Sequence, residues 1–190
     1  MSVKKLQTET SIIYYCTFTC YNYLTLFEWT DFYDQIYNWF NILIKKSIGI
    51  NGYVIMPNHL HCMLYLPEHS KPIDKIIGNG KRFMAYEIVN RLEQLHWHEL
   101  LSTLQEAVSI KERKKGKIHQ VFQPSFDAKP CDSEWFIEQK LNYIHRNPVS
   151  GKWSLVDDYT DYVHSSAGYY ECNRPALIDI MHYKDVGLLC

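Results

Sequence analysis

The chain has 190 residues, of which 46% are hydrophobic, and it carries a formal net charge of -1. This length and composition predict one domain, or one domain with an appended C-terminal segment, that can bury a full core. They exclude bulk disorder and a membrane span, because no apolar run approaches the roughly 20 residues that cross a bilayer. The first ten residues lack the apolar stretch of a secretory signal, so we expect a cytoplasmic protein.

Charge is distributed unevenly along the chain. Six acidic and two basic residues follow residue 152, which leaves 15 acidic and 18 basic residues, a net charge of +3, in residues 1–152. The segment Lys111–Lys117 holds five of these bases in seven positions. A net charge near zero is not typical of a protein whose main work is to hold a polyanion, but such a local patch can contact phosphates. The alternative for this patch is a solvated loop.

Six cysteines are scattered through the chain without a CxxC pair or a repeated spacing. This pattern is typical neither of a disulfide framework nor of a zinc ribbon. We therefore expect all six to be reduced, with Cys62 buried as a small apolar side chain.

Hydrophobic periodicity and turn residues predict an alternation of strands and helices. In chain order the expected elements are a strand at 11–21, a helix at 30–46, a hairpin at 51–66 with its turn at Pro57-Asn58, a helix at 72–95 broken or kinked at Gly78 and Gly80, a helix at 99–112, a short edge strand at 121–127, a helix at 132–147 ended by Pro148, and a short helix with an irregular tail. This order predicts an α+β fold, with one antiparallel sheet and helices packed on its face.

Two histidines stand two residues apart in the second strand of the expected hairpin. His59 and His61 would share one face of the sheet, because side chains at i and i+2 of a strand point the same way. The alternate positions are apolar and would turn into the core, which sets the register; they are Leu60, Cys62, Leu64 and Leu66. Two imidazoles on one face of a strand supply half of a metal site.

The helix that ends near Asn147 carries polar groups along one flank of its apolar stripe. Lys140, Tyr143 and Asn147 are spaced three and four residues apart, which places a phenol beside an amide oxygen. If this helix packs beside the histidine strand, His59, His61 and Asn147 could hold one Mg²⁺ or Mn²⁺ ion. Tyr143 would then lie next to a phosphate at that ion.

Two motifs together resemble a known family. Met56-Pro-Asn-His-Leu-His61, followed by Tyr143-Ile-His-Arg-Asn-Pro-Val149, is similar to the single-tyrosine HUH transposases of bacterial insertion sequences, and within them most like the REP-associated tyrosine transposases. The resemblance covers most of residues 11–170. Three further segments support it: Lys81-Arg-Phe-Met-Ala85, Val121-Phe-Gln-Pro124 and Tyr162-Val-His-Ser-Ser-Ala167.

The resemblance implies a ferredoxin-like sandwich of the HUH nuclease type and a metal-dependent enzyme that cleaves and transfers single-stranded or hairpin DNA. In that family a tyrosine attacks the scissile phosphate, leaving a 5′-phosphotyrosyl link and a free 3′-hydroxyl. By position, Tyr143 becomes the nucleophile, His59 and His61 become metal ligands, and Asn147 becomes the third ligand of Mg²⁺ or Mn²⁺. Residues 1–150 would form the catalytic domain, with 151–190 as a C-terminal helix and tail packed on it. A homodimer is one expected state, because related transposases often dimerise, although some REP-associated members act alone.

The chain departs from the family in its lower overall basicity and in the segment 95–117, which looks like an insertion. Two alternatives to a transposase remain: a non-catalytic single-stranded nucleic-acid-binding module of ferredoxin-like fold, and a metal-dependent phosphoesterase that uses water instead of Tyr143. His145 points away from Tyr143 on the helix, so we expect a surface or capping group; Asp127 is left unassigned. The expected DNA contacts, each of which could also be a solvated residue, are Lys81, Arg82, Lys140, Arg113, Lys114 and Lys115.

Overall fold

A computed structural model describes residues 12–188 of the chain. Its main elements are β1 (Ile12–Thr19), α1 (Leu26–Trp29), α2 (Tyr33–Ile44), β2 (Gly49–Met56), β3 (His59–Leu66), α3 (Ile73–Gln94), α4 (His98–Glu106), α5 (Ile110–Arg113), β4 (Asp127–Cys131), α6 (Glu134–Arg146) and α7 (Ala167–Cys172). Short 3-10 turns lie at Tyr21–Tyr23, Asn147–Val149, Tyr159–Asp161 and Tyr183–Leu188.

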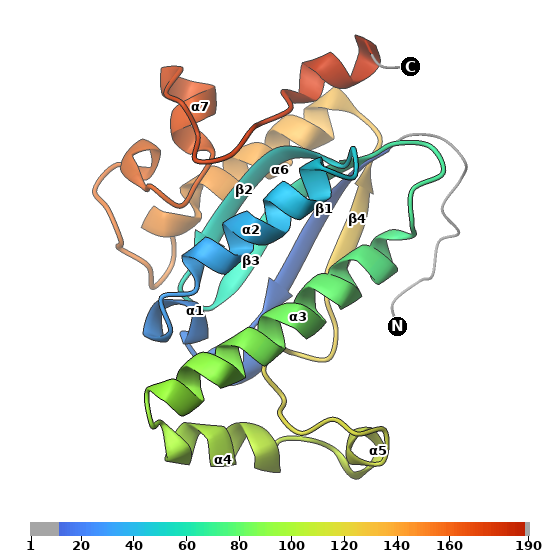
Figure 1. The fold of residues 1–190 in the computed structure, drawn as a ribbon. Coiled ribbons are helices and arrows are strands. Elements are labelled where there is room, and N and C mark those ends of the chain that lie inside the picture. The colour runs from blue at the N-terminus through green and yellow to red at the C-terminus, as the bar shows by residue number, and fades with distance from the viewer. Residues whose placement is uncertain (1–11, 189–190) are drawn as a thin grey trace.

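The strands form one antiparallel sheet in the order β2-β3-β1-β4. Helices cover both of its faces, rather than one face as the sequence indicated, with α2 and α3 on one side and α6 on the other (Figure 1). Each face has its own core. Leu60, Cys62, Leu64 and Leu66 pack toward α2 and α3, as the strand alternation predicted, while Met63 and Tyr65 pack toward α6.

The outer edge of β2 is covered by the C-terminal part of the chain. Ile55 N donates to His164 O at 2.8 Å, Ser166 N donates to Tyr53 O at 2.9 Å, and Met181 N donates to Ile50 O at 3.0 Å. These bonds occupy backbone groups that an edge strand would otherwise expose. As a result every residue of β2 is buried, and the sheet's free edge is β4.

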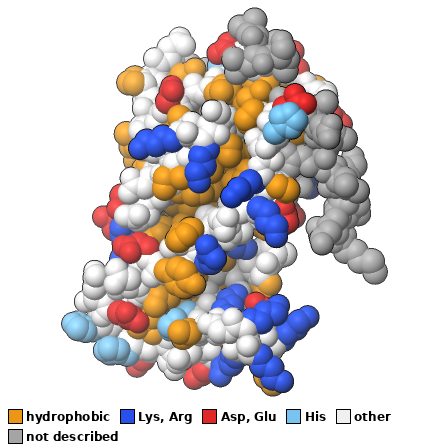
Figure 2. All heavy atoms as spheres, turned by 45° about the vertical axis from the view of Figure 1, so that its right-hand side comes forward, with side chains coloured by type: hydrophobic (Ala, Val, Ile, Leu, Met, Phe, Trp, Pro, Cys, Tyr) orange, Lys and Arg blue, Asp and Glu red, His pale blue; other side chains and the backbone are white. Residues whose placement is uncertain are grey.

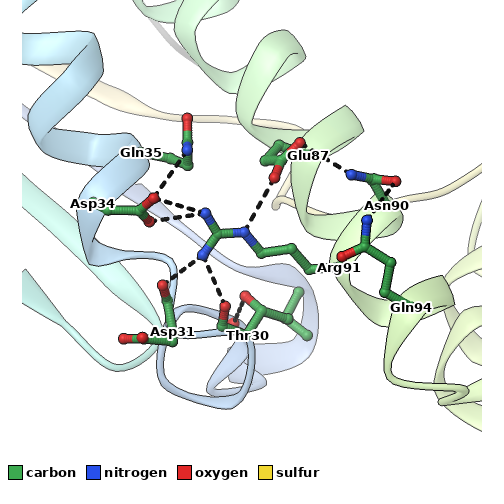
Figure 3. A network of polar contacts seen from close by, with 9 residues as sticks. Thr30, Asp31, Asp34, Gln35, Glu87, Asn90, Arg91 and Gln94 are labelled. Carbon is green, nitrogen blue, oxygen red and sulfur yellow. Dashed lines mark hydrogen bonds and ion pairs between the residues drawn. The ribbon is translucent and has the colours of Figure 1, made fainter.

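The middle helix runs without a break from Ile73 to Gln94, so the predicted interruption at Gly78 and Gly80 is wrong. Gly80 is where α3 comes close to α2: a Cβ atom added there would lie 2.7 Å from Trp39 Nε1. Arg91 joins the same two helices further along, donating to both carboxylate oxygens of Asp34 at 2.8 and 2.9 Å and to Glu87 at 3.1 Å (Figure 3). The glycine therefore permits close packing and does not end the helix.

The last predicted strand is displaced along the chain. Strand β4 begins at Asp127, where the predicted strand 121–127 ends, and of the earlier residues only Phe122 makes a bridge, to Cys20. Lys81 on α3 binds two carbonyls of this segment: its Nζ donates to Gln123 O at 2.8 Å and to Ser125 O at 3.3 Å. These carbonyls thus bind a side chain rather than a neighbouring strand, and Pro124 between them has no N–H to donate.

Other predictions of element boundaries need smaller corrections. The helix expected at 30–46 begins at Tyr33 and is preceded by the short α1, and the helix expected at 99–112 is two helices, α4 and α5. Helix α6 begins as expected, with Ser133 Oγ accepting a hydrogen bond from Phe136 N at 3.3 Å.

The described cysteines, Cys16, Cys20, Cys62, Cys131 and Cys172, are free thiols as predicted, whereas Cys190 lies outside the described residues. No helix within residues 12–188 is both long and apolar enough to cross a membrane.

Candidate active site

The two histidines lie on the α6 side of β3, one of the two central strands of the sheet. Their ring centroids are 4.7 Å apart, with the planes nearly perpendicular at 84°. His61 is only 5% exposed, and His59 is partly exposed where the strand begins. The shared face predicted from the i, i+2 spacing is therefore confirmed, and the rings are close enough to converge on one ion.

His59 has a defined tautomer. Its Nδ1 lies 2.6 Å from Asn58 Oδ1, and the amide group of Asn58 is oriented by a hydrogen bond from Nδ2 to Tyr23 O at 2.9 Å. An amide oxygen only accepts, so Nδ1 of His59 carries the hydrogen and Nε2 carries the lone pair. That lone pair is the group a metal ion needs.

His61 is held by two hydroxyl groups from β1. Thr17 Oγ1 lies 2.6 Å and Tyr15 Oη 2.9 Å from His61 Nδ1, and the Tyr15 ring stacks on the imidazole with a centroid distance of 5.7 Å. The strand register explains the contact, since Thr17 stands directly opposite His61. No local pattern in the sequence indicates these contacts, because the pairing of β1 with β3 is not a local property of either strand.

Burial keeps both imidazoles neutral. It lowers the pKa of His59 to about 4 and that of His61 to about 3, and the neighbouring His59 contributes to the shift at His61. Hydrogen bonding to the Asn147 side chain acts in the opposite direction on both rings. At neutral pH the two side chains are therefore unprotonated bases that can bind a cation without first losing a proton.

Helix α6 brings Tyr143 to the histidines. Its apolar stripe of Ile137, Leu141 and Ile144 packs on the sheet, and Leu141 fits over Gly52 of β2, where a side chain would meet it. This seats the flank with Tyr143 over the central strands: the ring centroid of Tyr143 lies 5.3 Å from that of His61. Tyr143 is 52% exposed, so the side chain is reachable from solvent while its ring contacts the buried His61.

Asn147 lies at the end of the same flank. Its Nδ2 donates to Tyr143 O at 2.8 Å. Hydrogen bonding to this side chain acts to raise the pKa of both histidines, which indicates that the acceptor Oδ1 faces them. Two imidazole nitrogens and one amide oxygen suit Mn²⁺, and the oxygen suits Mg²⁺. No group of three or more His, Cys, Asp and Glu side chains in residues 12–188 could hold a metal ion. A metal at this site would thus depend on Asn147 and would keep open positions for a substrate.

Lys140 is the one predicted DNA contact that lies at this site. Its Nζ is 5.9 Å from the ring centroid of Tyr143 and 5.1 Å from those of Tyr15 and Phe136. Asp127, which the sequence left unassigned, begins β4 opposite Thr17 and is exposed on the same side of the sheet. Burial raises the pKa of the Tyr15 phenol, and the negative charge of the Asp127 carboxylate adds a smaller increase.

The remaining predicted DNA contacts lie away from the histidines, on α3 and around α5. Figure 2 shows blue side chains gathered at the lower end of the molecule, where Figure 1 places α5. Several of these groups already have partners in the chain. Lys81 binds the two carbonyls described above, Arg113 donates to Val108 O at 3.0 Å and Gln105 O at 2.8 Å, and Lys115 pairs with Glu112 at 3.1 Å. Arg82 stacks on Phe83 at 4.9 Å.

The prediction that His145 is a surface or capping group is wrong. The side chain is 2% exposed, and its Nε2 lies 2.9 Å from Ser166 Oγ. Ser166 in turn accepts a hydrogen bond from Tyr53 N at 2.9 Å, so His145 helps to dock the C-terminal segment on β2. Burial lowers the pKa of His145 to about 4, which keeps it neutral in that position.

The fold places this protein in the α+β class, as a sandwich built on a four-stranded antiparallel sheet. The solved structure of the REP-associated tyrosine transposase bound to a REP hairpin has the same fold, with a TM-score of 0.63 and 16% sequence identity over 96% of this chain and 95% of that one. The fold implied by the sequence resemblance is thereby confirmed. A protein from Deinococcus radiodurans R1, proposed to be a transposase, superposes less well, with a TM-score of 0.41 and 17% identity over 75% of this chain and 95% of its own. No family model matches the chain, and no curated protein matches it in sequence.

Proposed function

We propose that this protein is a transposase that cleaves and rejoins single-stranded DNA through Tyr143. The observation that carries the proposal is the contact between an exposed tyrosine on α6 and His61, one of two adjacent neutral imidazoles on β3: the ring centroids of Tyr143 and His61 are 5.3 Å apart. A non-catalytic binding module has no need for this combination. The solved relative of the same fold is described with a REP hairpin bound, which supports hairpin DNA as the substrate.

Each residue has a chemical task in this proposal. Tyr143 Oη forms a bond to the scissile phosphorus, the bond from phosphorus to the 3′-oxygen breaks, and the phenolic proton is released as the leaving oxygen becomes a 3′-hydroxyl. The product is a 5′-phosphotyrosyl link whose reversal by a 3′-hydroxyl transfers the strand. Lys140, beside the Tyr143 ring, would face the negative charge of the bound phosphate.

His59, His61 and Asn147 would hold one Mg²⁺ or Mn²⁺ ion. When bound, such an ion stabilises the charge that develops on the phosphate oxygens. Both imidazoles are neutral, so they can bind the ion directly. The hydrogen bonds between His59 and Asn58 and from Asn147 to the carbonyl of Tyr143 hold two of the three side chains in place. We further propose that Lys81, Arg82, Arg113, Lys114 and Lys115 supply only weaker, peripheral phosphate contacts, because three of these five side chains already bind groups of the chain.

The direct test is trapping with a labelled hairpin oligonucleotide in Mn²⁺. We expect the unmodified protein to form an adduct that survives denaturing electrophoresis, and Tyr143→Phe to form none while still binding the oligonucleotide. Tyr86→Phe, a control at an exposed tyrosine of α3 outside the site, should react normally. His61→Ala should lose metal-dependent cleavage. Adduct formation by Tyr143→Phe would remove this residue from its role. Cleavage without adduct would indicate a phosphoesterase that uses water, and binding without cleavage would indicate a binding module.

A further inference from the structure

Strand β1 carries two hydroxyl side chains that meet one nitrogen of the buried His61. Thr17 Oγ1 and Tyr15 Oη lie 2.6 and 2.9 Å from Nδ1. A single ring nitrogen needs only one hydrogen-bond partner, so two hydroxyls exceed what is required merely to satisfy a buried polar atom. Both come from one face of one strand, at i and i+2.

The geometry restricts the imidazole in two ways. The backbone of Thr17 is fixed by pairing on both sides, with His61 on β3 and Asp127 on β4, so the Cα from which its hydroxyl extends is held by the sheet. The Tyr15 ring stacks on the imidazole at an interplanar angle of 19° and so limits its rotation. Because Nδ1 is taken by these groups, Nε2 is the nitrogen left to face Asn147 and the open side of the site.

Tyr15 also connects the histidine to the tyrosine of α6. Its ring meets that of Tyr143 edge to face, at a centroid distance of 6.4 Å and an angle of 76°. A change in the position of Tyr15 would therefore reach both His61 and Tyr143. Among the side chains that the structure describes around the site, Tyr15 is the one that makes ring contacts to both of these groups.

We infer that Thr17 and Tyr15 are positioning residues that hold His61 by Nδ1 and present its Nε2 to a divalent metal ion. The inference rests on the proposed metal site and adds two residues of β1 to it. Hydrogen bonds of this kind to a ligating histidine fix the orientation of the ring and raise its basicity as a ligand. A hydroxyl suits the task because it can accept the Nδ1 hydrogen in the metal-bound state and donate to Nδ1 in the other tautomer.

The test is a Mn²⁺ titration of the metal-stripped full chain, without DNA, read from the electron paramagnetic resonance signal of free Mn²⁺. Thr17→Val should weaken Mn²⁺ binding by about 10- to 100-fold, and Thr17→Ser, which keeps the hydroxyl, should stay within about threefold of the unmodified protein. Tyr15→Phe keeps the stacked ring and should show a smaller loss. The matched control is Thr19→Val, on the same strand face opposite His59, whose hydroxyl makes no hydrogen bond to any described residue; it should bind Mn²⁺ normally.

A second readout follows the histidine itself. Ring ¹⁵N chemical shifts of His61 in the metal-free protein should report one dominant tautomer, and Thr17→Val and Tyr15→Phe should each shift them toward an even mixture. Unchanged Mn²⁺ affinity and unchanged shifts in folded Thr17→Val and Tyr15→Phe would overturn the inference and leave the metal site itself standing. If the unmodified protein binds no Mn²⁺ in a His61-dependent way, the proposed metal site and this inference fall together. If Thr17→Val does not fold, the isosteric Tyr15→Phe decides.

Discussion

The amide nitrogen and the amide oxygen of Asn147 face different parts of the structure. Nδ2 donates to the carbonyl of Tyr143 at 2.8 Å, which ties the side chain to the last turn of α6. Oδ1 is left on the side of the histidines, where hydrogen bonding to this residue affects the pKa of both rings. The first contact is structural, whereas the second places a hard oxygen, the proposed third metal ligand, beside two imidazoles.

Substitution of Asn147 separates these two roles. Asn147→Ala removes both, and we expect Mn²⁺ affinity to fall by roughly tenfold or more. Asn147→Asp also loses the Nδ2 donor but keeps an oxygen and adds charge, so Mn²⁺ should bind at least as tightly as in the unmodified protein, because ligand charge raises affinity for a divalent cation. Isothermal titration with Mn²⁺ measures both. Equal losses in the two variants would show that Asn147 acts only through the helix end.

The residues of the site differ in how far sequence can predict them. His59 and His61 share a face because of the strand period alone, and Tyr143 and Asn147 share a flank because of the helix period alone. Thr17 reaches His61 only through the register of β1 with β3, which no local pattern reports. His145 is covered by a segment that returns to β2 from further along the chain, with Ser166, its hydrogen-bond partner, 21 positions away. Long-range pairing, not residue type, is the missing information.

Helix α3 shows the same limit at the level of an element. A glycine inside a helix is unfavourable on propensity, and two of them within three residues predict a break. The helix persists because buried side chains on both sides of the glycines, Ile77 and Met84 among them, pack into the core shared with α2. The two glycines themselves differ in what surrounds them. An added Cβ would have nothing within 4 Å at Gly78, whereas at Gly80 it would meet Trp39 Nε1 at 2.7 Å and Cε2 at 2.8 Å. Tertiary packing thus outweighs the local preference.

These two glycines predict stability changes of opposite sign. Gly78→Ala should stabilise the protein by about 0.5–1 kcal/mol, since alanine favours the helix and meets no neighbour. Gly80→Ala should destabilise it by about 1–3 kcal/mol, because the new methyl group must displace the Trp39 ring or separate α2 from α3. Urea unfolding measures both free energies, and each variant serves as the control for the other. Stabilisation by Gly80→Ala would show that the contact with Trp39 can relax at little cost.

In the whole molecule the site draws on three elements that are distant in sequence. Strand β1 supplies Tyr15 and Thr17, β3 supplies the histidines, and α6 supplies Tyr143 and Asn147. The sheet order places β1 next to β3, and α6 closes over both strands from the face opposite α2 and α3 (Figure 1). All of these groups belong to one chain, so a single copy can assemble the complete set without exchanging α6 with a partner.

This arrangement predicts the result of mixing two inactive variants. Tyr143→Phe keeps the histidines, and His61→Ala keeps Tyr143, the proposed nucleophile, so an exchange of α6 between chains would rebuild one working site in every mixed dimer. In an equimolar mixture that exchange would restore roughly a quarter of the normal adduct. Because the site is complete within one chain, we expect the mixture to form no more adduct with labelled hairpin DNA than His61→Ala forms alone. A mixture of unmodified protein with Tyr143→Phe controls for subunit competition and should give about half the normal adduct. Adduct well above the His61→Ala level in the first mixture would show that α6 acts on the histidines of a second copy.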